Sequence, residues 1–397
     1  MPTLPSHSSA PSAGWMGLRR GHRARPFEWV VERLIFGVSL STLALLLLIV
    51  VFVGREALPI LFGTANSSLI QPVIPAAEMD RIPAGELRAY LGMTAAEFKS
   101  MDRATLLEIM KTREEALAEV PPSYRQDPDA RINTTEWRHL LLPRRWTGYP
   151  EPAFVWQPIG TIHKYNIVPL ISGSLNLTLI GLLFAVPLSL AAALYLSQLA
   201  PTGLREWAKP GIELLAGLPS VVIGVFALLV LASFLQWCFG YQYRLNALVA
   251  GVALGITAIP LVFSIAEDAL SGVPRSYTAA ALALGATRWQ AALQVVLPAA
   301  LPGVLAAVVL GFGRCIGETM VVLMVSGNAS LLSWSPFDST RSITATIAAE
   351  MAEAVANGTH YEMLFLLGTL LFVVTFVTNL AGDLIIQRIR RRREGIV

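Results

Sequence analysis

The stretch from Leu301 to Asn328, LPGVLAAVVLGFGRCIGETMVVLMVSGN, most constrains the fold of this chain. It is apolar and long enough to cross a bilayer, yet it carries Arg314 and Glu318 near its middle. A charge at the centre of a membrane costs at least ~2.5–3.5 kcal/mol to insert, so such residues usually face a bundle interior or a water-filled path. Residues four apart on a helix lie on one face, so the two side chains can pair. The stretch therefore predicts a helix that is surrounded by other helices rather than by lipid.

Three glycines, Gly311, Gly313 and Gly317, surround this pair. The spacing of Gly313 and Gly317 lets another helix approach closely, and glycine weakens a helix locally, so we expect these residues to serve packing and hinge motion. Two functions are open for the charged pair. It is either a salt bridge that locks helices or subunits together, or a polar site on a translocation path. We favour the second interpretation.

The composition indicates a membrane protein with several spans. Hydrophobic residues make up 54% of the 397 residues, charged residues only 14%, and the mean hydropathy is +0.58. The two cysteines, Cys238 and Cys315, are far apart and predict neither a disulfide framework nor a metal site. No Gly-Lys dipeptide occurs, so the chain has no phosphate-cradling nucleotide loop of its own. We expect no catalytic residues, no cofactor and no nucleic-acid partner.

Six transmembrane helices are expected in an all-α fold. The predicted spans are residues 34–53, 171–199, 214–237, 245–265, 301–326 and 363–386. Arginines cluster in the tail at residues 1–33 and in the tail at residues 388–397, which places both ends of this multi-pass protein in the cytoplasm. The second, third and fourth spans contain Pro187, Pro219 and Pro260, and internal proline often kinks a membrane helix.

Residues 54–170 break this apolar pattern with mixed charges and many prolines, which predicts a water-exposed insertion on the outer side of the membrane. Between Ala84 and Val120 apolar residues recur at helical intervals, and Thr94 and Asp102 are suitable N-caps. We therefore expect two or three short helices. A structural cap is favoured over a catalytic domain, because the insertion has neither a nucleophile triad nor metal-ligand spacing.

The cytoplasmic loop at residues 266–300 is rich in alanine and is interrupted by Gly285, with Pro298 and Pro302 near the return to the membrane. This pattern predicts short helices on each side of a glycine turn. Such helices can lie flat at the cytoplasmic face and insert into a groove of a partner protein.

Two motifs carry a resemblance to a known family. The runs AALALGAT and VVLPAALPGV resemble the coupling loop of ABC-importer permeases, and LGFGRCIGETMVVLMVSGN is similar to the motif of the PstC family of phosphate permeases. The segments PFEWVVERL, YNIVPLISGSLNLTLIG and TATIAAEMAEA agree with that family. The resemblance covers about residues 26–60 and 153–390.

The resemblance implies the Type I, MetI-like permease fold with six membrane helices, embedded in the lipid of a bacterial inner membrane, with the insertion between helices 1 and 2 in the periplasm. It further implies a PstA-like second permease, a PstB-like ATPase dimer that hydrolyses ATP, and a periplasmic phosphate-binding protein. The family motif assigns Arg314, Glu318 and Thr319 to the translocation pathway, and assigns ATPase coupling to Ala280, Ala281, Gly285, Leu297 and Pro298. Where the family usually has Glu before the paired alanines, this chain has Ala279.

Three alternatives differ in the function they predict. A permease for molybdate, sulfate or phosphonate shares the coupling loop, but the Arg-x-x-Gly-Glu-Thr run favours phosphate. A proton-coupled secondary carrier also uses intramembrane ion pairs, but it has no need for an alanine-rich cytoplasmic loop. A membrane sensor that only binds an ATPase predicts no substrate flux.

Overall fold

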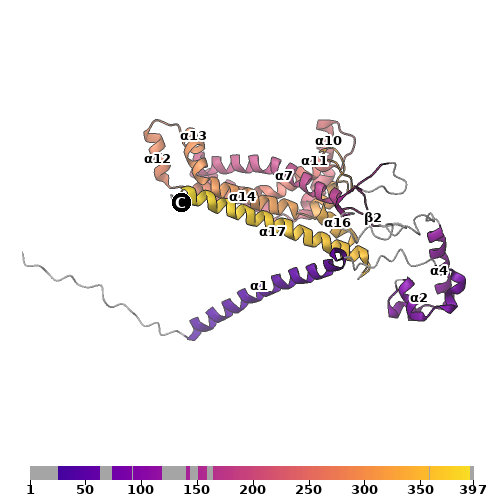
Figure 1. The fold of residues 1–397 in the computed structure, drawn as a ribbon. Helices are drawn as coiled ribbons and strands as arrows, with labels where there is room; N and C mark the ends of the chain where they lie inside the picture. The colour runs from indigo at the N-terminus through magenta and orange to yellow at the C-terminus, as the bar shows by residue number, and fades with distance from the viewer. Residues whose placement is uncertain are drawn as a thin grey trace, which may run out of the picture. The chain divides into compact units, whose positions relative to one another are not determined.

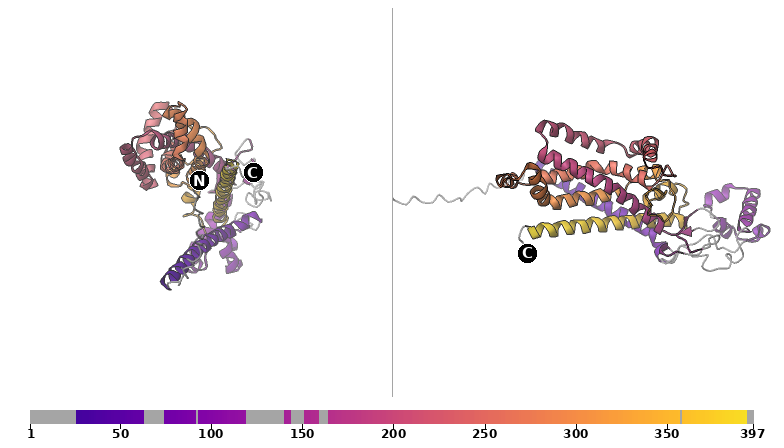
Figure 2. Two further views of the ribbon diagram at one scale, coloured as in Figure 1. Left: turned by 90° about the vertical axis from the view of Figure 1, so that its left-hand side faces the viewer. Right: turned by 90° about the horizontal axis from the view of Figure 1, so that it is seen from above.

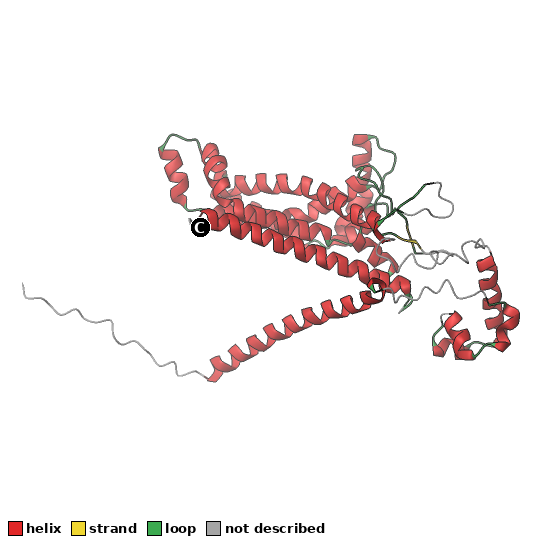
Figure 3. Ribbon diagram, viewed as in Figure 1, coloured by secondary structure: helices red, strands yellow, loops and turns green. Residues whose placement is uncertain are grey.

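The computed structural model describes residues 26–62, 74–91, 93–118, 140–143, 151–158, 164–356 and 358–393. Most of the expected N-terminal tail, parts of the insertion and the last four residues lie outside this set. The chain divides into two compact units, Met1–Phe52 and Val53–Val397. Within the described residues the fold is helical apart from two short strands, which confirms the predicted all-α class (Figure 3).

Six helical segments are long and apolar enough to cross a membrane, as predicted. They are Val31–Leu61, Val168–Leu199, Ser220–Phe239, Ala247–Ser271, Arg288–Ile316 and Thr359–Arg388. The first belongs to α1 (Pro26–Leu61), which is longer than the expected 34–53. Apolar side chains of α1 are exposed along most of its length, whereas Ala57 and Ile60 near its end are buried in the second unit.

The centre of the second unit is α11 (Ala247–Ser271), which packs against α7 (Val168–Leu194) and α14 (Leu297–Ile316). Glycines allow α11 to approach α7 closely: a Cβ on Gly251 would lie 2.4 Å from Ile180 Cγ2. The long helices α7, α14 and α17 (Thr359–Arg393) run alongside one another (Figures 1 and 2). A π-helical turn, η4 (Tyr195–Leu199), completes the second span.

The third span differs from the prediction at its start. It consists of α9 (Ser220–Phe226), the π turn η6 (Ala227–Leu231) and α10 (Ala232–Phe239). Pro219 is the N-cap of α9 rather than an internal residue, because proline suits a position that needs no N–H donor. The preceding residues form an unpredicted amphipathic helix, α8 (Thr202–Leu214), and the 3-10 turn η5 (Leu215–Gly217).

The loop expected at residues 266–300 is largely helical and partly continuous with the spans. Helix α11 extends to Ser271, and α12 (Arg275–Ala283) follows. After Gly285, α13 (Arg288–Ala291) continues through the π turn η7 (Ala292–Val296) into α14. The α12–α13 corner and the C-terminal end of α17 lie at the same end of this unit (Figure 1).

The described part of the insertion forms a small helical cluster of its own. It contains η2 (Ala76–Arg81), α2 (Ala84–Leu91), α3 (Ala95–Ser100) and α4 (Arg103–Ala118), with Met79, Leu87, Tyr90 and Met110 buried among them. The predicted N-caps are confirmed: Thr94 forms a capping box with Glu97, and Asp102 Oδ1 accepts from the Thr105 N–H at 3.1 Å. Further along, the strands β1 (Trp156–Gln157) and β2 (Lys164–Tyr165) pair antiparallel and lead into α7.

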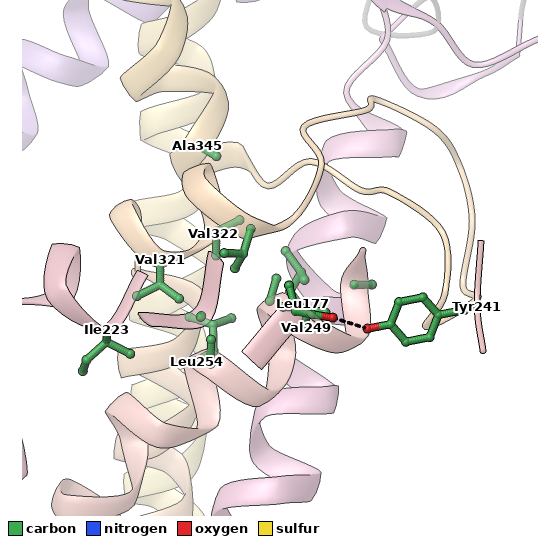
Figure 4. Packing of buried hydrophobic residues seen from close by; sticks show 14 residues of the cluster. Leu177, Ile223, Tyr241, Val249, Leu254, Val321, Val322 and Ala345 are labelled. Atoms are coloured by element: carbon green, nitrogen blue, oxygen red, sulfur yellow. Dashed lines mark hydrogen bonds between the residues drawn. The ribbon is translucent and has the colours of Figure 1, made fainter. Parts of the chain in front are cut away.

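A second packed core forms around α15 (Met320–Val325). Val321, Val322 and Val325 are buried against Ile223 of α9, Leu254 of α11 and Ala345 of α16 (Ile343–Glu350) (Figure 4). Tyr241 closes the core with a hydrogen bond of 3.4 Å from its hydroxyl to the Ala232 carbonyl. This core fixes the residues immediately after the charged pair.

Candidate functional site

The charged pair lies at a break between two helices, so the prediction of one helix through residues 301–326 is wrong. Helix α14 ends at Ile316, Gly317 is its C-cap, and α15 begins only at Met320. The Glu318 N–H bonds to the Cys315 carbonyl at 3.2 Å rather than continuing the α-helical pattern. Glycines lower the free energy needed to interrupt a helix; Gly311 and Gly313 precede this break, and Gly317 lies in it.

The predicted pairing is present despite this break. Arg314 Nη2 lies 3.3 Å from Glu318 Oε2. The environments of the two side chains differ: Glu318 is 6% exposed, whereas Arg314 is 48% exposed in this chain. A buried carboxylate needs a compensating charge or hydrogen bonds, and Arg314 supplies the charge. The guanidinium retains further donors for an anion, because it carries five N–H groups.

Thr319 is the last residue of the break and the N-cap of α15. It is half-buried, and its carbonyl accepts the Leu323 N–H at 2.9 Å. Arg314, Glu318 and Thr319 are thus together, as the sequence motif requires. Their roles in translocation remain a proposal.

The three glycines near the pair have different surroundings. A Cβ on Gly311 would lie 2.6 Å from Val262 Cγ2, so this glycine allows close packing of α14 on α11. A Cβ on Gly313 would meet only Asn379 Oδ1, at 3.6 Å, and one on Gly317 would meet only the Gly313 carbonyl, at 3.3 Å. The close helix approach predicted for Gly313 and Gly317 is therefore not made within the described part of this chain; Gly317 caps α14 instead.

A polar wall that the sequence reasoning missed supports the break. Thr344 Oγ1 donates to the Glu318 carbonyl at 2.8 Å and contacts Ser342 Oγ at 2.9 Å. The Ile343 N–H donates to Ser174 Oγ on α7 at 2.9 Å. A Cβ on Gly173 would lie 2.2 Å from the Arg341 carbonyl, so only glycine fits there. Buried serines and threonines in apolar stretches are the sequence signal that could have found this wall.

The far end of α16 carries a second buried ionic cluster around Glu350. Arg341 Nη1 lies 2.8 Å from Glu350 Oε1, and His360 Nε2 lies 3.5 Å from Glu350 Oε2. Trp156 Nε1 also donates to Glu350 Oε2 at 3.2 Å, which ties the β1–β2 hairpin to α16. Burial raises the pKa of the Glu350 carboxyl even though Arg341 lowers it. Helix α16 therefore connects this cluster to the break.

A third network joins α8 to the end of α11. The carboxylate of Glu267 is buried and accepts from Arg205 Nη2 at 2.5 Å and from Lys209 Nζ at 2.7 Å. Lys209 Nζ also donates to Asp268 Oδ1 at 2.9 Å. The hydrogen bonds to Glu267 and Asp268 raise the pKa of Lys209. The sequence did not indicate this network, because its members are about 60 residues apart along the chain.

The residues assigned to ATPase coupling are at the opposite end of α14 from the charged pair. From Pro298 to Arg314 the helix rises by roughly 24 Å at 1.5 Å per residue. Gly285 has φ +85°, which confirms that the turn between α12 and α13 needs a left-handed residue. The Thr287 side chain accepts from the Gln290 N–H at 3.2 Å and starts α13 with a capping box.

The coupling corner exposes apolar side chains. Ala281 is buried and Ala280 is exposed, while Leu297 and Pro298 form the first turn of α14. Leu284 is 90% exposed, and Tyr277, Leu282 and Trp289 are each between 41% and 54% exposed. An exposed group of large apolar residues indicates a surface that binds a partner.

Comparison with known proteins gives one matching family and several relatives. Residues 166–391 match the family described as "Binding-protein-dependent transport system inner membrane component". The probable ABC transporter permease YqgH of Bacillus subtilis is 37% identical over 223 residues, which is 56% of this chain and 72% of that protein. The phosphate transport system permease PstC of Mesorhizobium japonicum is 34% identical over 256 residues, which is 60% of this chain and 77% of that protein.

Two further similarities complete this comparison. PstC of Pasteurella multocida is 33% identical over 60% of this chain and 79% of its own length. Among solved structures, a chain of the inward-facing MetNI methionine ABC transporter gives a TM-score of 0.44 at 19% identity, over 55% of this chain and 95% of that one.

Proposed function

Because this chain belongs to the binding-protein-dependent transport system inner membrane components, we propose that it carries inorganic phosphate from periplasm to cytoplasm as one permease subunit of an ABC importer. As a multi-pass inner-membrane permease of this family, it works with an ATPase and a substrate-binding protein. The PstC names of several relatives support phosphate as the cargo.

The arrangement of Arg314 and Glu318 supports this proposal most directly. A dehydrated phosphate anion needs compensating charge, and one guanidinium can bind two phosphate oxygens. Arg314 is held at the helix break by the buried carboxylate of Glu318, yet nearly half of its side chain remains accessible. In the proposed cycle Glu318 neutralises Arg314 between transport events, and Arg314 turns to the anion when it arrives. Thr319 lies beside them as a neutral hydrogen-bonding group.

We further propose which partners the two ends of the chain meet. A PstA-like subunit supplies the second half of the path and faces the break at Gly313 and Gly317. A PstB-like ATPase dimer binds the corner formed by α12 and α13, where Leu284 and Trp289 are exposed. Both termini are then cytoplasmic, and the insertion faces the phosphate-binding protein in the periplasm. Without the Glu that the family has at position 279, the exposed apolar residues supply most of the ATPase contact.

A specific observation also favours a second role for the pair. Because Glu318 is buried, an ion pair there can lock α14 to a neighbouring subunit without touching cargo. Permeases for molybdate, sulfate or phosphonate would use the same pair for a different anion. A pair that only locks subunits and a pair that binds another oxyanion predict different transport results from a phosphate site.

Uptake of labelled phosphate tests the cargo. A strain that lacks its own phosphate permease, but keeps the other subunits, is complemented with this chain. We expect uptake that unlabelled phosphate suppresses and that sulfate, molybdate and phosphonate at equal concentration leave unchanged. Suppression by another oxyanion would assign that anion as the cargo, and absence of any flux from an assembled complex would favour a sensor.

A further inference from the structure

A cavity of about 550 Å³ opens at the end of the second unit that carries α12. Its walls come from the end of α11, the start of α12, the first half of α14 and Ile386 near the end of α17. Two membrane-spanning segments, Ala247–Ser271 and Thr359–Arg388, end near these residues, and helix α14 begins there at Leu297. The volume is within the usual range for small-molecule sites, roughly 300–1,000 Å³.

Small side chains create this space. Ala269 on α11 and the C-cap residue Gly272 line the cavity together with Ala300, Gly303 and Ala306 on α14. A Cβ on Gly303 would lie 2.4 Å from Ala269 Cβ, so the two helices touch at this point. Helix α17 touches α14 at Gly382, where a Cβ would lie 2.6 Å from Val309 Cγ1, and one turn later Ile386 lines the cavity instead.

The walls of the cavity are mainly apolar. Its polar side chains are Asp268 and Tyr277. Asp268 is already engaged by Lys209 at 2.9 Å, and Tyr277 is half-exposed. A hydrocarbon chain suits such walls better than a charged metabolite does, because a buried charge would find no compensating cation among them.

A strongly basic segment follows the cavity directly. Helix α17 continues past Ile386 to Arg393, and the sequence has arginine at position 388 and from 390 to 393. Position 390 comes one helical turn after Ile386. Basic clusters next to a membrane helix attract anionic lipid headgroups, and the planar guanidinium matches the geometry of a phosphate.

We propose that the cavity and the end of α17 form a binding site for an anionic phospholipid, with an acyl chain in the cavity and the phosphodiester at the basic C-terminal end of α17, which begins with Arg388. The combination of an apolar pocket at the membrane boundary with adjacent positive charge selects this occupant over an ATPase side chain. The lipid would fill the space between α11, α14 and α17 next to the coupling helix α12. This site is separate from the Arg314–Glu318 pair at the other end of α14.

Native mass spectrometry of the complete transporter tests the proposal. The complex is released from bilayers that contain phosphatidylglycerol, cardiolipin and phosphatidylethanolamine. We expect retained phosphatidylglycerol or cardiolipin in the wild type, and loss of most of it in Ala306→Phe, which fills the cavity. Leu310→Phe is the matched control, because it adds the same ring one turn further along α14, at an exposed position outside the cavity lining.

A pair of charge variants provides the second arm. Arg388→Gln with Arg390→Gln should also lose anionic lipid, whereas the two lysine replacements should keep most of it. Millimolar inorganic phosphate should not displace the lipid, because the acyl chain contributes to binding. The proposal is overturned if Ala306→Phe and the glutamine variant both retain wild-type lipid. It is also overturned if Ala306→Phe releases the ATPase while the lipid is unchanged, since the occupant is then the ATPase.

Discussion

The hydroxyl of Thr344 donates a hydrogen bond of 2.8 Å to the carbonyl oxygen of Glu318, so α16 is bonded to the break between α14 and α15. At its other end, α16 carries Glu350, which contacts Arg341, His360 and Trp156. One short helix thus joins the candidate translocation site to the hairpin that precedes α7. Seven residues of α16, from Thr344 to Glu350, separate the two contacts.

Replacing Thr344 with valine tests this connection. The variant keeps the shape of the side chain but leaves the buried Glu318 carbonyl without its donor. The loss should lower the free energy of unfolding by roughly 1–3 kcal/mol. We expect slower phosphate uptake with normal recovery of the complex. Thr375→Val on α17 is the control, because among the described residues its hydroxyl donates only to carbonyls of its own helix, and it should transport normally. Equal uptake by the two variants would show that the bond does not matter for transport.

Gly285→Val should detach or uncouple the ATPase, because a side chain at φ +85° is strained. The permease should still reach the membrane. Gly240→Val is the matched control: Gly240 has φ +66° but caps α10, remote from the coupling corner along the chain. ATPase co-purification and stimulated ATP hydrolysis are measured for both. Normal stimulation of ATP hydrolysis by the Gly285 variant would show that this loop is not the coupling element.

The Glu350 cluster should make the stability of the complex depend on pH. Burial raises the pKa of Glu350 in the folded state, so its contribution is fully present below the ordinary carboxyl pKa and is lost as pH rises through the raised value. Glu350→Gln cannot titrate. The apparent Tm of the wild type relative to Glu350→Gln should therefore fall as pH rises above the ordinary glutamate range.

Because the imidazole of His360 can also bind a proton and lies 3.5 Å from Glu350 Oε2, this comparison is made in a His360→Gln background. The repulsion from Glu353 raises the pKa of Glu350 by less than burial does. A Tm difference that is flat or rises with pH would contradict the assignment to Glu350.

Single cysteines at positions 100 and 276 test the orientation in the membrane. Both serines are exposed, and the experiment uses a background without Cys238 and Cys315. We expect a membrane-impermeant thiol reagent to label position 100 from outside, and position 276 only after permeabilisation. The opposite pattern would invert the proposed topology.

Local features of this fold could be predicted from the sequence, and long-range ones could not. Six spans follow from apolar length, the cap at Thr94 from its capping box, and the turn at Gly285 from glycine between helical runs. The predicted pairing of Arg314 with Glu318 is also confirmed, because a separation of one helical turn brings the two side chains together even at a helix end.

The missed features depend on contacts between distant residues. The break at Gly317 is fixed partly by Thr344, which lies 26 residues beyond Glu318. Helix α8 was missed because its amphipathic pattern matches neither a membrane span nor a flexible loop, and its Arg205 and Lys209 find Glu267 only in the folded chain. The two-residue strands at Trp156 and Tyr165 are too short to give a period in the sequence.

Phosphate uptake by Arg314→Met/Glu318→Leu, measured with complex recovery on the same membranes, tests the central claim most directly. Removing Arg314 alone leaves the buried carboxylate of Glu318 unpaired and should lower the free energy of unfolding by roughly 3–5 kcal/mol, whereas replacing both residues with apolar ones is often nearly neutral for stability. We predict that the double variant assembles with its ATPase but carries no phosphate, and that Arg314→Lys, which keeps the charge but loses the fork, transports poorly. Full uptake by the assembled double variant would show instead that the pair only locks the structure.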